Sequence, residues 1–432
     1  MSLEKTLHKF KILVIGIQVF LHGIFLFGLG QCTALAPDEV TYSNLFEKSQ
    51  NSKLVGSTNS VIGSSNYIFE ANFQLASLFT KLELSNLDAL RITSIIFFTI
   101  SQILNLYLID WNTKNLDNRY RISLYFLNFM TPSIFIFSGL ALRESLVLLS
   151  LSLIFFGLQK VEESKIIVGQ ILLFLGLLVI SGLKIYLFLL IVFVFFMYFL
   201  INKFKSKSII LFFLLSFSLC STINFNNIVS VFKSTSIIST SETTPRSLPK
   251  NESSKRFEPS SPDPKSVTLT ELELCRATDS LGFLRYVLHI INPETAGTET
   301  AGTETAGDIY GGADVRGFLH PKYYLVNLFY FLFNPLLSLE LSTARWFLIE
   351  APIWIFLTLS FIVCFARSPR RVLRLTGVPS FMLYFSLLFV VYSTATEVNV
   401  GTSLRHRVLL LFPLSLLVAH LSTTAERKSP QE

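Results

Sequence analysis

Apolar segments of about twenty residues recur along this chain, and they constrain its fold more than any other feature. A helix needs about twenty such residues to cross a hydrocarbon core of about 30 Å. The composition agrees, because 51% of the 432 residues are hydrophobic and only 15% are charged. We therefore predict an all-α, polytopic transmembrane helix bundle of about ten spans, with helices at residues 10–30, 89–110, 121–139, 144–158, 166–182, 184–202, 208–223, 346–366, 376–393 and 405–422.

The positive charges predict the orientation of these spans. Lys and Arg residues cluster in short linkers that alternate with the apolar segments, and they form no continuous stripe, so the net charge of +7 indicates no nucleic-acid partner. By the positive-inside rule the linkers are cytoplasmic, as are both termini. The first apolar segment lacks a convincing cleavage site and is interpreted as a retained signal anchor. The cytoplasmic clusters are Lys5, Lys9 and Lys11; Lys114, Arg119 and Arg121; Lys160 and Lys165; Lys203, Lys205 and Lys207; Arg367, Arg370, Arg371 and Arg374; and Arg427 and Lys428.

This topology divides the chain into three parts. Residues 1–223 form an N-terminal transmembrane module with a first outer loop at 31–88, and residues 346–432 form a C-terminal transmembrane module. Residues 224–345 form a large outer loop, which we expect to be partly disordered because its Ser/Thr/Pro/Lys-rich stretch buries too little apolar surface. Within it, the aromatic segment 323–341 is interpreted as an interfacial helix, because a further span would move the Arg367–Arg374 cluster outside.

Several familiar motifs are missing from the chain. The four cysteines Cys32, Cys220, Cys275 and Cys364 show no CxxC spacing, so they indicate neither a zinc site nor a redox pair. Cys32 and Cys275 both fall in outer loops, where they could pair or remain unpaired. The chain has no glycine-rich phosphate loop, no HExxH and no GxSxG elbow.

Four polar clusters on the predicted outer side carry the candidate chemistry. The first is Asp38-Glu39, a few residues beyond the first span, with Tyr42 three residues further on. Adjacent carboxylates there can act as a general base or hold a metal. Acidic residues that follow Pro37 are equally typical of a helix N-terminus, where they complement the helix dipole.

The other three clusters are cationic. Arg143-Glu144 occupies a tight turn and either forms a self-contained pair or presents Arg143 to a lipid phosphate. Lys184, followed by Tyr186, is the polar break in some 37 apolar residues, and it either snorkels to the interface or contacts phosphate.

The last cluster, Arg405-His406-Arg407, opens the final span against the positive-inside tendency. It indicates anion binding at a helix N-terminus or snorkelling of the long side chains. Consecutive helical residues diverge by about 100°, so a shared site would need several helices to converge.

At these clusters the chain resembles the GT-C superfamily of polytopic glycosyltransferases, which includes protein O-mannosyltransferases and bacterial lipid A aminoarabinose transferases. An acidic motif, often Asp-Glu-x-x-Tyr, recurs in that superfamily just after the first helix, and Asp38, Glu39 and Tyr42 match it. The resemblance covers about the first 200 residues and the last helix. The chain departs from many members because it lacks a folded soluble C-terminal domain and a recognisable acceptor-binding motif.

The resemblance implies transfer of a sugar from a polyprenyl-phosphate donor to a glycan, lipid or protein acceptor on the non-cytoplasmic face. It implies a place in a bacterial inner (plasma) membrane and in cell-envelope polysaccharide biosynthesis. Asp38 would be the general base, and Glu39 would position it or join it in binding a divalent metal, the one cofactor considered. The donor phosphate would be held by Arg143, Lys184, Arg405 and Arg407, with support from Tyr42, Glu144, Tyr186 and His406.

Two other functions remain open on sequence grounds. An oligosaccharide repeat-unit polymerase or ligase for surface polysaccharide would use the same arginines without requiring Asp38. A transporter or flippase for a lipid-linked glycan would typically show inverted repeats and broken helices near the midplane, and no repeat relates the two halves of this sequence.

Overall fold

The structure is a computed structural model that describes residues 3–29, 37–50, 66–82, 84–114, 117–141, 143–202, 207–223, 324, 328, 331–332, 350–396 and 400–426. The regular secondary structure of these residues is helical, without strands. The helices are α1 (Leu3–Leu29), α2 (Pro37–Gln50), α3 (Asn66–Thr80), α4 (Asn86–Thr113), α5 (Asn118–Met130), α6 (Pro132–Gly139), α7 (Glu144–Glu162), α8 (Ile166–Leu183), α9 (Ile185–Asn202), α10 (Lys207–Ile223), α17 (Ala351–Arg367), α18 (Pro369–Val372), α19 (Gly377–Thr396) and α20 (Val400–Glu426).

The all-helical class is confirmed, and several helices could cross a membrane. Within the described ranges α4, α7, α8 and α19 are long and apolar enough to do so. The bent pair α5–α6 would make a fifth span, and α9, α10 and α17 contribute shorter apolar helices. Each of the ten predicted segments overlaps a helix or a helix pair, but a count of ten spans stays a prediction.

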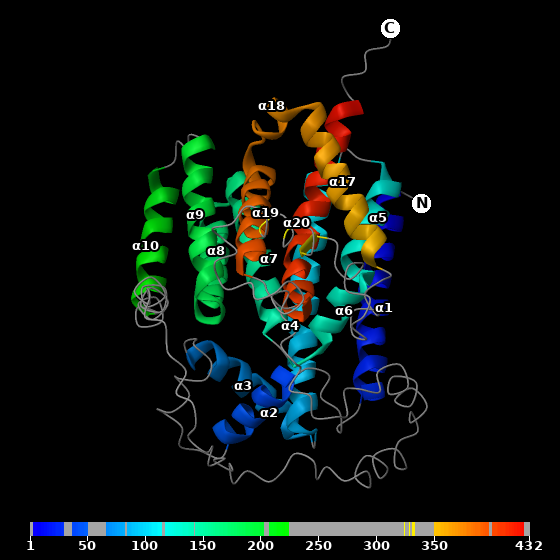
Figure 1. The fold of residues 1–432 in the computed structure, drawn as a ribbon. Coiled ribbons are helices and arrows are strands. Elements are labelled where there is room, and N and C mark those ends of the chain that lie inside the picture. The colour runs from blue at the N-terminus through cyan, green and yellow to red at the C-terminus, as the bar shows by residue number, and fades with distance from the viewer. Residues whose placement is uncertain are drawn as a thin grey trace, which may run out of the picture.

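The helices form a bundle, and different short helices lie at its two ends (Figure 1). The short basic helix α18 lies at one end, and α2 and α3 lie at the opposite end. The sequence analysis assigns α18 to the cytoplasmic side and α2–α3 to the first outer loop, so their separation agrees with that assignment. Most of the large loop predicted at 224–345, and most of the interfacial helix predicted at 323–341, lie outside the described residues.

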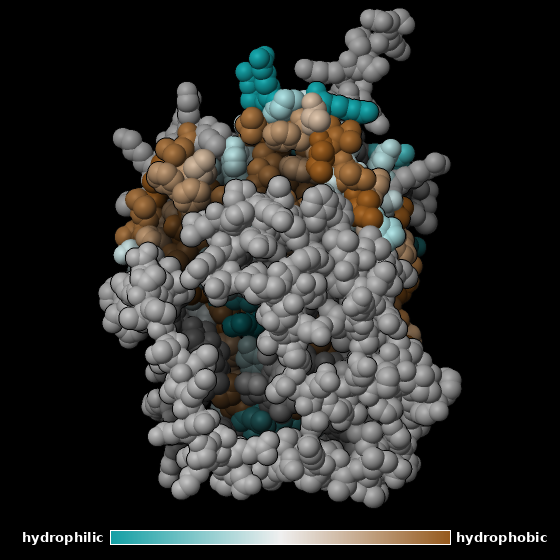
Figure 2. Space-filling view, in the orientation of Figure 1, coloured by the Kyte–Doolittle hydropathy of each residue, from teal (hydrophilic) through white to brown (hydrophobic). Residues whose placement is uncertain are grey.

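The surface supports a lipid environment. Figure 2 shows hydrophobic residues over α9, α10 and α17, whereas hydrophilic residues gather at the α18 end. Phe196 of α9, Leu215 of α10 and Phe356 of α17 are each more than half exposed. A broad apolar exterior of this kind suits contact with lipid, because soluble proteins expose only limited apolar patches.

One predicted span differs from the structure. The segment predicted as a single helix at 121–139 is divided at Thr131, which has the extended angles φ −68° and ψ 123°, and the two halves meet at 41°. Pro132 explains the break, because proline has no N–H and disfavours a helical conformation at the preceding residue. The carboxylate of Glu350, just before α17, accepts a hydrogen bond from the Ser133 backbone N–H at the start of α6.

Three glycines bring α7 and α8 into close contact. A Cβ added to Gly169 would lie 2.7 Å from the backbone oxygen of Gly157, and one added to Gly176 would lie 2.8 Å from the Ser150 oxygen. Small residues at a helix crossing let the backbones approach in this way. The crossing fixes α7, which begins at Glu144, against α8, which ends one residue before Lys184.

Buried hydrogen bonds join further helices inside the bundle. Between α4 and α7, the Ser152 hydroxyl donates to Asn105 Oδ1 at 2.9 Å and lies 2.8 Å from the Ser101 hydroxyl. Between α5 and α20, Asn128 donates to the Ser415 hydroxyl at 3.1 Å. Contacts of this kind are worth about 0.6 kcal/mol each in membrane proteins, so they set register more than they supply stability.

Candidate functional site

Three helix starts converge at the end of the bundle that carries α2 and α3, and they bring together most of the predicted cationic residues. The short α6–α7 turn delivers Arg143 and Glu144 at the start of α7. Lys184 is the single non-helical residue between α8 and α9, with φ −143° and ψ 89°. Arg405 and His406 come from α20. The requirement for several converging helices is therefore met.

A buried lysine and histidine share a short hydrogen bond at the centre of this group. Lys184 Nζ lies 2.7 Å from His406 Nε2, and the Tyr186 hydroxyl lies 3.2 Å from the same nitrogen. Lys184 is 2% exposed and His406 is 8% exposed. With Lys184 as an ammonium group, which can only donate, Nε2 is the acceptor and the His406 ring is neutral.

Glu144 supplies a buried negative charge, but its contacts with the cations are longer than hydrogen bonds. Its Oε1 lies 3.6 Å from Lys184 Nζ and 3.7 Å from Arg405 NH1. Neither carboxylate oxygen accepts a hydrogen bond from the residues that the structure describes. The cations therefore surround Glu144 at ion-pair distance, without a direct hydrogen bond to its carboxylate among the described residues.

Positive charge exceeds negative charge in this group. Arg143 also acts on Glu144 electrostatically, and its NH1 donates to the Leu183 backbone oxygen at 3.4 Å. Three cations against one carboxylate leave a charge of +3 − 1 = +2 while His406 is neutral. We name Arg143, Glu144, Lys184, Tyr186, Arg405 and His406 the cationic cluster.

Aromatic rings from α9 and α19 border the cationic cluster. Tyr186 stacks on Tyr392 with ring centroids 5.0 Å apart and planes at 12°. The Phe389 ring meets the His406 ring edge-on at 6.5 Å. Apolar walls lower the local dielectric, so charges in the cluster interact more strongly than they would in water.

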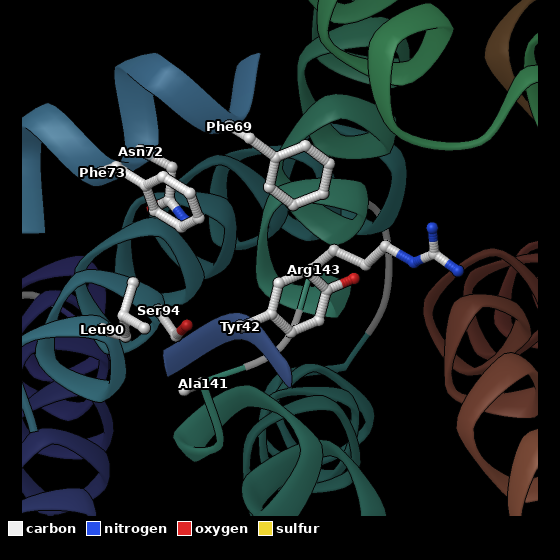
Figure 3. A pocket seen from close by; sticks show the side chains of 8 residues that line it. All are labelled: Tyr42, Phe69, Asn72, Phe73, Leu90, Ser94, Ala141 and Arg143. Carbon is white, nitrogen blue, oxygen red and sulfur yellow. The ribbon is translucent and has the colours of Figure 1, made fainter. Parts of the chain in front are cut away.

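Arg143 also lines a pocket together with Tyr42, the tyrosine of the Asp-Glu-x-x-Tyr motif (Figure 3). The pocket lies between α2, α3, α4 and the α6–α7 turn and opens to solvent, and its empty space of about 240 Å³ includes part of that solvent. Tyr42 stacks on Phe69 with centroids 5.6 Å apart, and Asn72 and Ser94 add polar groups. Figure 3 shows the Arg143 guanidinium extending away from the aromatic rings, so its backbone and stem belong to the pocket while its charge reaches outward. Arg143 thus links the pocket that contains Tyr42 to the cationic cluster.

The acidic pair is placed by backbone only. The helix α2 begins at Pro37, so Asp38 and Glu39 fall in its first turn, as the helix-start interpretation predicts. In the register of α2, position 38 lies one turn before position 42. The side chains of Asp38 and Glu39, and the possible partners Cys32 and Cys275, lie outside the described residues. A catalytic role for the pair stays a prediction.

Arg407 does not join the other predicted phosphate ligands. It is 1% exposed, its NH1 donates to the Leu332 backbone oxygen at 3.2 Å, and its guanidinium lies 4.7 Å from the Trp354 ring. The Trp354 indole N–H donates to Glu350 at 3.4 Å. The divergence of neighbouring residues on α20 explains the separation, since Arg407 faces α17.

The sequence analysis overlooked some residues around the site. Tyr392 and Phe389 carry no charge and give no signal within an apolar segment. Glu350 and Arg91 did give a signal in the sequence, because both are charged residues inside predicted spans. Both are fully buried, and Arg91 pairs with Asp88 at 3.9 Å.

Neither a metal site nor a relative identifies this protein. Among the side chains that the structure describes, no three His, Cys, Asp or Glu residues are grouped closely enough to hold a metal ion. That search does not reach the side chains of Asp38 and Glu39, the candidate ligands. No protein family, curated protein or solved structure matches the chain. Its function therefore has to be inferred from the chemistry of the site.

Proposed function

We propose that this protein is a membrane glycosyltransferase that moves a sugar from a polyprenyl-phosphate donor to an acceptor on the non-cytoplasmic face. The observation that carries the proposal is the cationic cluster, in which Arg143, Lys184 and Arg405 converge from three separate parts of the chain. A charge of +2 at the end of an apolar bundle suits one anionic lipid head group, whose hydrocarbon tail would lie in the bilayer.

The proposed chemistry requires little beyond charge and one base. The acceptor oxygen forms a bond to the anomeric carbon of the sugar, the bond from that carbon to the phosphate oxygen breaks, and the polyprenyl phosphate leaves with the electron pair. The negative charge on the leaving phosphate grows during this step, and Lys184 and Arg405 would stabilise it. Glu144 would hold these two cations in position before the donor binds.

Asp38 would remove the proton from the acceptor hydroxyl. Its position in the first turn of α2, one helical turn before the pocket residue Tyr42, supports this assignment. General-base catalysis contributes about 10²- to 10⁴-fold in rate. Any divalent metal would bind here as well, since Asp38 and Glu39 are adjacent carboxylates at the same helix start.

Substitution of Asp38 tests this proposal. In cells whose wild-type gene is replaced, we expect Asp38→Asn to lower incorporation of labelled sugar into envelope glycan by about 10²-fold or more. Glu47→Gln provides a matched control, because Glu47 is an exposed carboxylate on the same helix. Normal glycan assembly by Asp38→Asn, at wild-type protein levels, would contradict the proposal and favour a repeat-unit polymerase or ligase.

A further inference from the structure

The contact between Lys184 and His406 joins two basic groups, and it determines where a proton can go when an anion binds. Lys184 Nζ lies 2.7 Å from His406 Nε2, whereas it lies 3.6 Å from Oε1 of the Glu144 carboxylate. Lysine therefore makes its shorter contact with a neutral ring and its longer contact with the charged group. An incoming anion would compete with the imidazole for the lysine hydrogens, because an anion also attracts the ammonium charge whereas a neutral ring does not.

Loss of the lysine hydrogen bond would leave His406 Nε2 with the weaker contact to the Tyr186 hydroxyl, 3.2 Å away. Near the ring are also Tyr186 from α9, Phe389 from α19, and Glu144 from α7, and the charges of Arg143 and Arg405 surround the same carboxylate. A proton on Nε2 would turn this acceptor into a donor that can bind the same anion.

The charge balance permits that proton. The cationic cluster carries +2 with His406 neutral, and a phosphodiester bearing one negative charge lowers this to +1. Uptake of one proton from solvent restores +2, so the protonated complex holds no more positive charge than the protein did before binding. The ring is 8% exposed, and the proton would lie against the bound anion.

We infer that His406 takes up a proton when a phosphodiester binds the cationic cluster, and that it then serves as an additional, ligand-dependent cation for the phosphate. The inference rests on the proposed function, which supplies a phosphodiester as the donor. It assigns His406 a role in the reaction, because the imidazolium would stabilise the charge that grows on the leaving phosphate. A neutral side chain of the same shape would bind the donor, but its affinity would not change with pH.

Calorimetric titration of the full-length chain in nanodiscs of zwitterionic lipid tests the inference. The probes are farnesyl phosphoryl glucose, mannose, galactose and N-acetylglucosamine, which are phosphodiesters with a constant charge over about pH 5.5 to 8.5. Titration in two buffers of different ionisation heat counts the protons taken up. We expect up to one proton per ligand, and affinity that strengthens as pH falls, by at most about tenfold per pH unit.

Two variants separate the protonation of His406 from its structural role. His406→Gln keeps a hydrogen-bond acceptor for Lys184 but cannot hold a proton, so we expect binding without proton uptake and without pH dependence. His420→Gln, which changes another histidine of α20 outside the cluster, should behave like the wild type. Proton uptake that persists in His406→Gln would refute the inference, and so would pH-independent binding to the wild type.

The remaining outcomes distinguish the inference from the proposed function. Failure of every sugar phosphodiester to bind at any pH would refute both. Equal binding of dihexanoyl phosphatidylglycerol, with the same proton uptake, would support the role of His406 but assign the cluster to a membrane phospholipid and contradict the proposed donor.

Discussion

The α7–α8 crossing offers a direct test of how the bundle holds its site, through the substitution Gly169→Ala. The added Cβ would lie 2.6 Å from a Val161 methyl group, 2.7 Å from the Gly157 backbone oxygen and 2.9 Å from the Val161 backbone nitrogen. Contacts below 3.0 Å with backbone atoms cannot be relieved by rotating a side chain. The two helices must therefore separate.

The cost can be estimated against a control. Overpacking a tight core costs about 1 to 3 kcal/mol. Replacing glycine by alanine in a helix also gains about 1 kcal/mol of helix propensity, which would mask part of that cost. Gly16→Ala is the control for this gain, because Gly16 also lies in a helix and its added Cβ would meet nothing within 4 Å. The difference between the two variants should isolate the packing cost of about 1 to 3 kcal/mol.

Unfolding of the purified protein in a titration of SDS into mild-detergent micelles would measure both variants. We expect Gly169→Ala to unfold at lower SDS fraction than the wild type and than Gly16→Ala. If the two variants unfold together, the close approach of α7 and α8 described above is wrong. A loss of phosphodiester binding by Gly169→Ala alone would show in addition that this crossing positions Glu144 relative to Lys184.

Two further substitutions follow from the structure. Glu144→Gln removes the buried carboxylate and should destabilise the protein by about 3 to 5 kcal/mol in the same SDS titration, because it leaves buried cations uncompensated. The control Glu163→Gln breaks a less buried pair with Lys160 at 2.7 Å, and it should cost under about 1 kcal/mol. Equal effects would contradict the burial of Glu144. Gly377→Ala places a side chain at φ +68° and should cost about 1 to 2 kcal/mol; wild-type stability would show that this turn has another conformation.

Much of the helix layout follows from the sequence, because apolar length is a local property. Lys184 could be singled out because it interrupts two long apolar segments, and the structure places it at the joint between α8 and α9. The break at Pro132 was also encoded locally, but the surrounding apolar residues concealed it. The partners of each charge could not be predicted, since the contact of Lys184 with His406 joins residues 222 positions apart.

Arg405 and Arg407 illustrate the same limit within one helix. They stand two positions apart and look alike as a sequence pattern, yet Arg405 approaches Glu144 and Arg407 lies on Trp354. Their different roles depend on which helices pack on each side of α20, and only tertiary structure supplies that. The acidic motif could be placed at a helix start from Pro37 alone, because proline at the first helical position is a local signal.

The spread of the cationic cluster along the chain has a consequence for biosynthesis. Arg143 and Glu144 are synthesised first, Lys184 follows forty residues after Glu144, and Arg405 and His406 belong to α20. In the topology predicted from the sequence, the Glu144 carboxylate is therefore already present when Lys184 and Arg405 cross to the outer side, and it can offset an orientation that the positive-inside tendency opposes. The group is complete only after α20 inserts, so a chain that stops early holds part of the bundle but never an assembled site.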